Sequence, residues 1–127
     1  MSNPVTRGAC LCGDIQFETT AQPKGASMCH CSQCRKQSGG IWSSAYVKDT
    51  ELQITGPVSW FEASPTAKRG FCARCGSYLF WKAHDEDTTS FALGALTAPT
   101  GITIEKHIFV RDKGDFYEIA DGVAQRD

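Results

Sequence analysis

Seven cysteines constrain the fold of this 127-residue chain more than any other feature. They form three short groups: Cys10 and Cys12; Cys29, Cys31 and Cys34; and Cys72 and Cys75. Cysteines that serve only as packing volume do not cluster at the spacings of metal ligands. The count is odd, and the N-terminus MSNPVTRGACLCG lacks the basic and apolar segments of a secretory signal. We therefore expect metal binding in a reducing, cytoplasmic setting rather than a disulfide framework.

The length and composition fit one ordinary globular domain, which we predict to span residues 1–127. Hydrophobic residues make up 41% of the chain, charged residues 21%, and the formal net charge is -1. The longest basic blocks are the pairs at 35–36 and 68–69, so a nucleic-acid partner is not expected. No stretch approaches the roughly 18 apolar residues of a membrane-spanning helix, so no membrane partner is expected either.

Short runs of β-branched and aromatic residues, separated by Gly, Pro and Asp, predict a mostly β fold. Ile15 and Phe17 alternate with polar residues, as they would in a half-buried antiparallel strand. One short helix is predicted over 32–39, with Ser32 as its N-terminal cap and glycines at its end. The strands are expected at 14–20, 42–48, 51–55, 58–64, 77–83, 88–96 and 106–110.

Two of the cysteine groups together predict a closed site of four thiolates. Alternate residues of an extended strand share a face, so Cys10 and Cys12 could both reach one ion while Leu11 points into the protein. Cys72 and Cys75 form a CxxC turn, and the following Gly76 can adopt a positive φ. Such a closed site is typical of structural zinc.

The CHCSQC segment then supplies three ligands for a second ion, namely Cys29, Cys31 and Cys34. Catalytic zinc sites have three protein ligands and one exchangeable position. Two alternatives stay open: these thiols are reduced and partly buried, or one of them joins the other four. A histidine could also close the site; His30 would point away from its neighbours and act as a spacer, whereas His84 and His107 are not excluded.

A three-thiolate zinc favours a thiol substrate over hydrolysis. Its net charge of -1 acidifies a bound water less than three neutral histidines would, and an incoming thiol suits a soft site better. The implied chemistry is the making or breaking of a carbon–sulfur bond, with Cys29, Cys31 and Cys34 as the functional residues. Arg35 and Lys36 could hold a carboxylate of an acidic thiol substrate, or they are solvated residues on the short helix.

The segments GACLCG, CHCSQCRKQSGG and FCARCGS resemble the glutathione-dependent formaldehyde-activating enzyme family, which includes the centromere protein V proteins. The resemblance implies a β-tent fold of small antiparallel sheets stapled by two zinc ions. It implies a carbon–sulfur lyase that forms S-hydroxymethylglutathione from formaldehyde and glutathione. The implied ligands are Cys10, Cys12, Cys72 and Cys75 for the structural zinc, and Cys29, Cys31 and Cys34 for the second.

Two other functions remain compatible with the sequence. In the first, the chain is a zinc-stabilised binding module without catalytic activity. In the second, its thiols form a redox or metal-buffering device, because zinc thiolates release their metal when they are oxidised. The sequence does not identify the thiol, the residues that grip it, or the oligomeric state.

Overall fold

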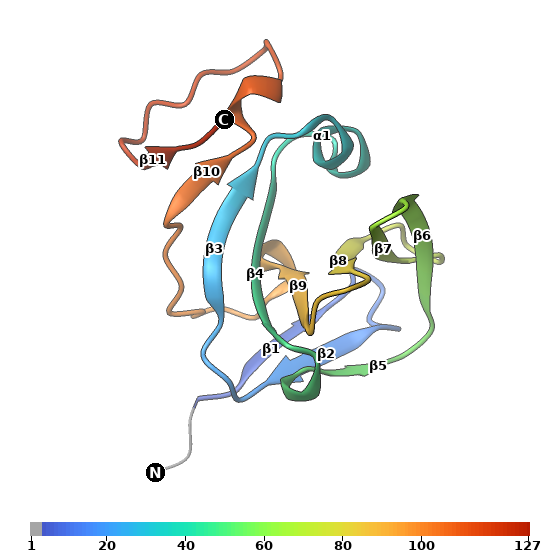
Figure 1. Cartoon of the computed structure of the whole chain (residues 1–127). Coiled ribbons are helices and arrows are strands. Elements are labelled where there is room, and N and C mark those ends of the chain that lie inside the picture. The colour runs from blue at the N-terminus through green and yellow to red at the C-terminus, as the bar shows by residue number, and fades with distance from the viewer. Residues whose placement is uncertain (1–3) are drawn as a thin grey trace.

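The computed structural model describes residues 4–127 and is mostly β, with one α-helix among those residues (Figure 1). The helix α1 spans Ser32–Ser38, and three short 3-10 turns cover Asp49–Glu51, Leu93–Ala95 and Val110–Asp112. The strands are β1 Thr6–Ala9, β2 Gln16–Thr19, β3 Lys24–Cys29, β4 Trp42–Lys48, β5 Gln53–Thr55, β6 Val58–Ser64, β7 Ala67–Cys72, β8 Tyr78–Ala83, β9 Thr88–Ala92, β10 Lys106–Ile108 and β11 Ala124–Gln125.

The strands form two sheets. A three-stranded sheet has the order β1-β2-β5, and an eight-stranded sheet has the order β11-β10-β3-β4-β9-β8-β7-β6. In Figure 1 the smaller sheet lies across one end of the larger, strongly curved one. Pairing is antiparallel, as expected, except at β10, which runs parallel to both β3 and β11. The mostly β prediction with one short helix is therefore confirmed, with a mixed edge to the larger sheet.

The core lies between the two sheets. Ile15 and Phe17, from the smaller sheet, are 0% and 3% exposed, which confirms that they face inward. The Phe17 ring contacts Phe80 on β8 and Phe91 on β9, with ring centroids 5.1 and 5.5 Å apart. Aromatic pairs at these separations stabilise a fold by more than their buried area alone, so the packing of these three rings helps to hold the two sheets together.

Four strands fall outside the predicted set, namely β1, β3, β7 and β11. Their sequences, such as KGASMC in β3 and AKRGFC in β7, combine Gly, Ala, Ser and Lys and have little intrinsic β preference. They are strands because each has hydrogen-bonded neighbours: β3 lies between β4 and β10, and β7 lies between β6 and β8. Tertiary pairing here overrides local propensity.

Helix α1 is the one α-helix of residues 4–127, and it spans seven residues. No helix in this part of the chain is both long enough and apolar enough to cross a membrane.

Candidate metal centres

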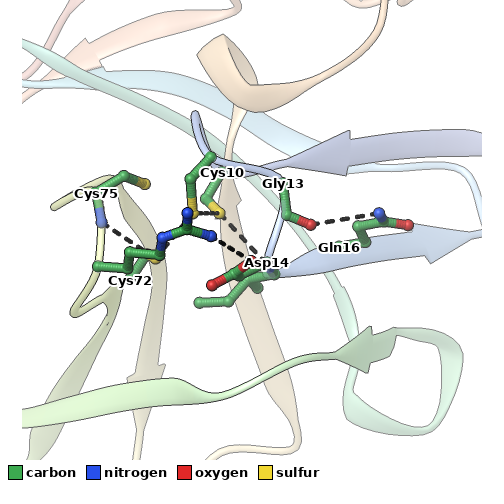
Figure 2. A network of polar contacts seen from close by, with 9 residues as sticks. Cys10, Gly13, Asp14, Gln16, Cys72 and Cys75 are labelled. Carbon is green, nitrogen blue, oxygen red and sulfur yellow. Dashed lines mark hydrogen bonds and ion pairs between the residues drawn. The ribbon is translucent and has the colours of Figure 1, made fainter.

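The first cysteine cluster joins the two sheets. Cys10 and Cys12 follow β1 of the smaller sheet, while Cys72 ends β7 of the larger sheet and Cys75 lies in the turn before β8 (Figure 2). The sulfur of Cys12 is 3.6 Å from that of Cys10 and 3.7 Å from that of Cys72. A tetrahedral ion with zinc–sulfur bonds of about 2.3 Å requires sulfurs about 3.8 Å apart. All four sulfurs lie within 4.8 Å of one another, so the cluster fits zinc.

The local backbone at Cys10 and Cys12 differs from the expected strand. The two residues lie in a tight turn, in which the Gly13 N–H donates to the Cys10 carbonyl and Gly13 has a φ of 85°. Curling of the turn, rather than strand alternation, brings the two sulfurs together. Leu11 is consequently 87% exposed, and the prediction that it points into the protein is wrong.

The CxxC turn has the predicted geometry. The Gly76 N–H donates to the Cys72 carbonyl at 2.7 Å, and Gly76 has a φ of 82°. The Cys75 N–H also donates to the Cys72 sulfur. Hydrogen bonds from the Ser77 side chain and backbone lower the pKa of Cys75 to about 5, which favours the thiolate that metal binding requires.

The second cluster surrounds the start of α1. Cys29 ends β3, Cys31 precedes the helix and Cys34 lies in its first turn, and their three sulfurs lie within 4.8 Å of one another. Cys31 is the N-cap: its sulfur accepts the Cys34 N–H at 3.3 Å, so the prediction of Ser32 as the cap is wrong. Cys31 has extended backbone angles, which turn its sulfur back toward the helix amides.

The three thiols of this cluster differ in exposure. Cys29 and Cys34 are 7% and 3% exposed, whereas Cys31 is partly exposed. Trp42 pairs with Cys29 across β3 and β4, and its ring stacks on Tyr78 with centroids 4.2 Å apart. Both aromatic residues pack in the same buried cluster as Cys29 and Cys34. The cluster is therefore walled by aromatic rings on its buried side, and Cys31 is its outer member.

Arg69 is a residue of this centre that the sequence did not reveal. It lies on β7, is 4% exposed, and its Nη1 donates to the Cys34 sulfur at 3.4 Å and to the Tyr78 hydroxyl at 3.0 Å. The interaction with Cys29, together with Arg69, lowers the pKa of Cys34 to about 6. The hydrogen bond with Cys34, and then burial, raise the pKa of Cys29. Arg69 is 35 positions from Cys34, so no local motif marks it.

Arg35 and Lys36 follow Cys34 on α1, as expected, but neither forms an ion pair within residues 4–127. The Arg35 Nε is buried without a hydrogen-bond partner. Lys36 is exposed and lines a cavity of about 370 Å³ beside the cluster. The lining residues of this cavity are Gln33, Lys36, Gln37, Phe61, Ala63 and Arg69. The predicted cation Lys36 and the unpredicted Arg69 thus share one cavity.

The histidines do not close the second cluster. His84 pairs with Glu62 at the surface, and His107 bonds to His30 and Asp121. Both ring nitrogens of His30 are also taken, by His107 and Tyr117, so His30 is more than a spacer. Within residues 4–127 the metal-ligating groups therefore separate into four cysteines and three, with no histidine in either set.

Comparison with known proteins agrees with this arrangement. Residues 5–112, which include all seven cysteines, match the family model described as glutathione-dependent formaldehyde-activating enzyme. A Schizosaccharomyces pombe protein named as an uncharacterized lyase is 26% identical over 125 residues, covering 92% of this chain and 87% of that protein. The crystal structure of a Rhodobacter sphaeroides protein has the same fold, with a TM-score of 0.60 at 22% identity, and the match covers 95% of this chain and 99% of that chain.

Proposed function

Because the chain belongs to the glutathione-dependent formaldehyde-activating enzyme family, we propose that it is a zinc-dependent carbon–sulfur lyase acting on a small thiol adduct. The observation that carries this proposal is the cluster of Cys29, Cys31 and Cys34, which has three thiols and no fourth protein ligand among residues 4–127. A zinc ion bound there would supply an exchangeable position and a Lewis acid that lowers the pKa of an incoming thiol. The other four cysteines are proposed to hold a structural zinc.

Arg69 provides the charge that this centre needs. Three thiolates around a dication leave a charge of -1, and the arriving substrate is acidic. The buried guanidinium beside Cys34 offsets that charge without adding a ligand. Its hydrogen bond to the Tyr78 hydroxyl holds it against the aromatic wall, so it keeps a defined position.

The cavity of about 370 Å³ beside α1 is the proposed binding site of the thiol substrate. Arg69 and Lys36 would bind carboxylates, Gln33 and Gln37 would bond peptide groups, and Phe61 would cover the aliphatic part. A peptide thiol with carboxylates, such as glutathione, matches this lining. A larger cavity of about 510 Å³ reaches Trp42 and Tyr78 but has no charged residue in its lining, so it suits an acidic thiol less well.

The reaction that the family name implies joins glutathione and formaldehyde. The thiol sulfur adds to the aldehyde carbon, and the thiol proton ends on the former carbonyl oxygen, so atoms and charge balance. The chain's own contribution is to bind and orient the acidic thiol and to neutralise charge near its sulfur. We further propose a cytoplasmic location, because none of the seven cysteines forms a disulfide and cysteines that bind metal must stay reduced.

A Cys31→Ser variant tests this proposal. Cys31 is the outermost ligand of its cluster, so we expect a folded protein that keeps one zinc ion and loses turnover of thiol adducts. Zinc stoichiometry by elemental analysis and the rate above the uncatalysed reaction, with glutathione and formaldehyde, are the measurements. The rate matters because the adduct also forms without an enzyme. A wild-type protein with two zinc ions and no acceleration with any small thiol would favour the alternative, a zinc-stabilised binding module.

A further inference from the structure

Four residues form a continuous chain of hydrogen bonds behind the three-cysteine cluster. The Tyr117 hydroxyl is 2.5 Å from the Nδ1 of His30, whose Nε2 is 2.8 Å from the Nδ1 of His107. The Nε2 of His107 is in turn 2.8 Å from a carboxylate oxygen of Asp121. His30 is 0% and His107 is 3% exposed, while Asp121 lies near the surface. His30 stands between the ligands Cys29 and Cys31.

Each hydrogen bond in this chain can have a defined donor. The Asp121 carboxylate only accepts, and hydrogen bonds from the Val123 N–H and from His107 lower its pKa. If each ring carries one proton, His107 donates to Asp121, His30 donates to His107, and the Tyr117 hydroxyl donates to His30. Every buried ring nitrogen then has a partner, so both ring orientations are set.

Backbone hydrogen bonds also join the segments that carry these four residues. The His30 N–H donates to the Ile108 carbonyl, and β10 pairs in parallel with β3 so that Ile108 lies opposite Cys29. The N–H of Arg126, the residue after β11, donates to the His107 carbonyl. The Lys113 ammonium donates to the Tyr117 carbonyl at 2.7 Å. The C-terminal segment is thereby tied to the metal-ligand segment, although it supplies no cysteine.

We infer that His30, His107, Tyr117 and Asp121 are positioning residues for the three-cysteine centre. Their hydrogen bonds hold His30 on the buried side. This keeps the backbone of the two flanking cysteines in the orientation that presents both sulfurs to one ion. Tyr117 and Asp121 lie beyond the residues 5–112 that match the family model. The inference rests on the proposed metal binding at these three cysteines, and not on turnover.

The expected size of the effect follows from outer-shell partners of metal ligands, whose loss lowers metal affinity by about 10- to 100-fold. The hydrogen-bonded row of His30, His107, Tyr117 and Asp121 acts through the backbone beside the ligands rather than on a ligand atom. We therefore expect about a tenfold effect, the lower end of that range. The four-cysteine centre contains none of the four hydrogen-bonded residues, so we expect its metal affinity to be unaffected.

The test uses the full chain loaded with Co²⁺ in both centres and four variants. Tyr117→Phe removes the first donor and Asp121→Ala removes the last acceptor, whereas Asp121→Asn keeps an acceptor oxygen. Tyr46→Phe is the matched control, because Tyr46 is an exposed tyrosine on β4. The measurements are the rate at which each centre loses Co²⁺ to a chelator and the visible d–d spectrum of the three-cysteine centre, obtained by difference from Cys31→Ser.

We expect Tyr117→Phe and Asp121→Ala to release Co²⁺ from the three-cysteine centre about tenfold faster and to shift its d–d bands. Tyr46→Phe should behave like the wild type, and Asp121→Asn should lie nearer the wild type than Asp121→Ala does, because its single oxygen can still accept from His107 although it can no longer accept from Val123 as well. Wild-type release and spectra in the first two variants would overturn the inference, and so would equal acceleration at both centres, which would indicate general loosening. Failure of the proposed function looks different: the expected metal response without any thiol-adduct turnover would overturn that proposal and support this one.

Discussion

Arg69 shows how one buried side chain sets the electrostatics of the three-cysteine cluster. It is almost fully buried, and one of its nitrogens bridges the Cys34 sulfur and the Tyr78 hydroxyl. A buried cation is costly unless it is paired, so the guanidinium needs the thiolate as much as the thiolate needs the guanidinium. The same pairing raises the pKa of Arg69, after the opposing effect of its burial, and lowers that of Cys34.

An Arg69→Met variant should raise the pKa of Cys34 above its value of about 6, because it removes the hydrogen bond and the positive charge that favour the thiolate. The measurement is thiolate absorbance against pH in protein depleted of metal at the three-cysteine centre. Arg74→Met is the matched control, because Arg74 is exposed and pairs with Asp14 near the other cluster. An unchanged midpoint in Arg69→Met would contradict this assignment.

Helix α1 is short, and hydrogen bonds at its two ends contribute much of its stability. At its start, the Cys31 sulfur accepts a hydrogen bond from a backbone N–H of the first turn. At its end, Gly39 has a φ of 84° and its N–H donates to the Arg35 carbonyl at 2.9 Å. Seven residues are too few to form a stable helix alone, so these caps and the packing of Cys34 hold it in place.

A Gly39→Ala variant should destabilise the protein by about 1 kcal/mol, because a left-handed backbone is unfavourable for a residue with a Cβ. Gly40→Ala is the matched control: Gly40 has no positive φ, and both positions have open space around an added Cβ. The measurement is thermal or urea unfolding of the zinc-loaded protein. If both variants lose the same stability, the cap is not what distinguishes these positions.

A zinc ion held by the four cysteines would act on the molecule as a whole, because these residues come from both sheets. Cys10 and Cys12 belong to the smaller sheet's side, and Cys72 and Cys75 to the larger sheet's side. Structural zinc contributes on the order of 10 kcal/mol of binding free energy, and whole domains are stable by only about 5–15 kcal/mol. The binding free energy of a zinc ion at these four cysteines would thus be comparable with the entire stability of the fold. The single domain over residues 1–127 stays a prediction.

Cys75→Ala should unfold the protein, because it opens the centre that joins the sheets. Cys34→Ala should leave the protein folded with one zinc ion fewer, because the three-cysteine cluster lies at one helix and its loss leaves the core between the sheets intact. Zinc stoichiometry and the thermal unfolding midpoint of each variant are the measurements. Equal losses of thermal stability in the two variants would contradict the division into structural and functional centres.

The division of the cysteines into four and three, the mostly β class and the position of the helix all follow from local sequence. Ligand spacings such as CxC and CxxC are encoded over a few residues, and so are strand alternation and helix ends. Local patterns were wrong where two short-range solutions compete. The Cys10–Cys12 segment curls into a turn and exposes Leu11, and Cys31 caps the helix in place of Ser32.

Strand pairing and burial, which are long-range, set the surroundings of the three-cysteine centre. Arg69 reaches Cys34 across 35 positions, and His30 meets His107 and Tyr117 across 77 and 87. These contacts depend on the register of β7 against β8 and of β10 against β3, and strands β3 and β7 have little β preference of their own. The candidate metal ligands are thus visible in the sequence, whereas the charge and the hydrogen bonds around them arise only when the sheets assemble.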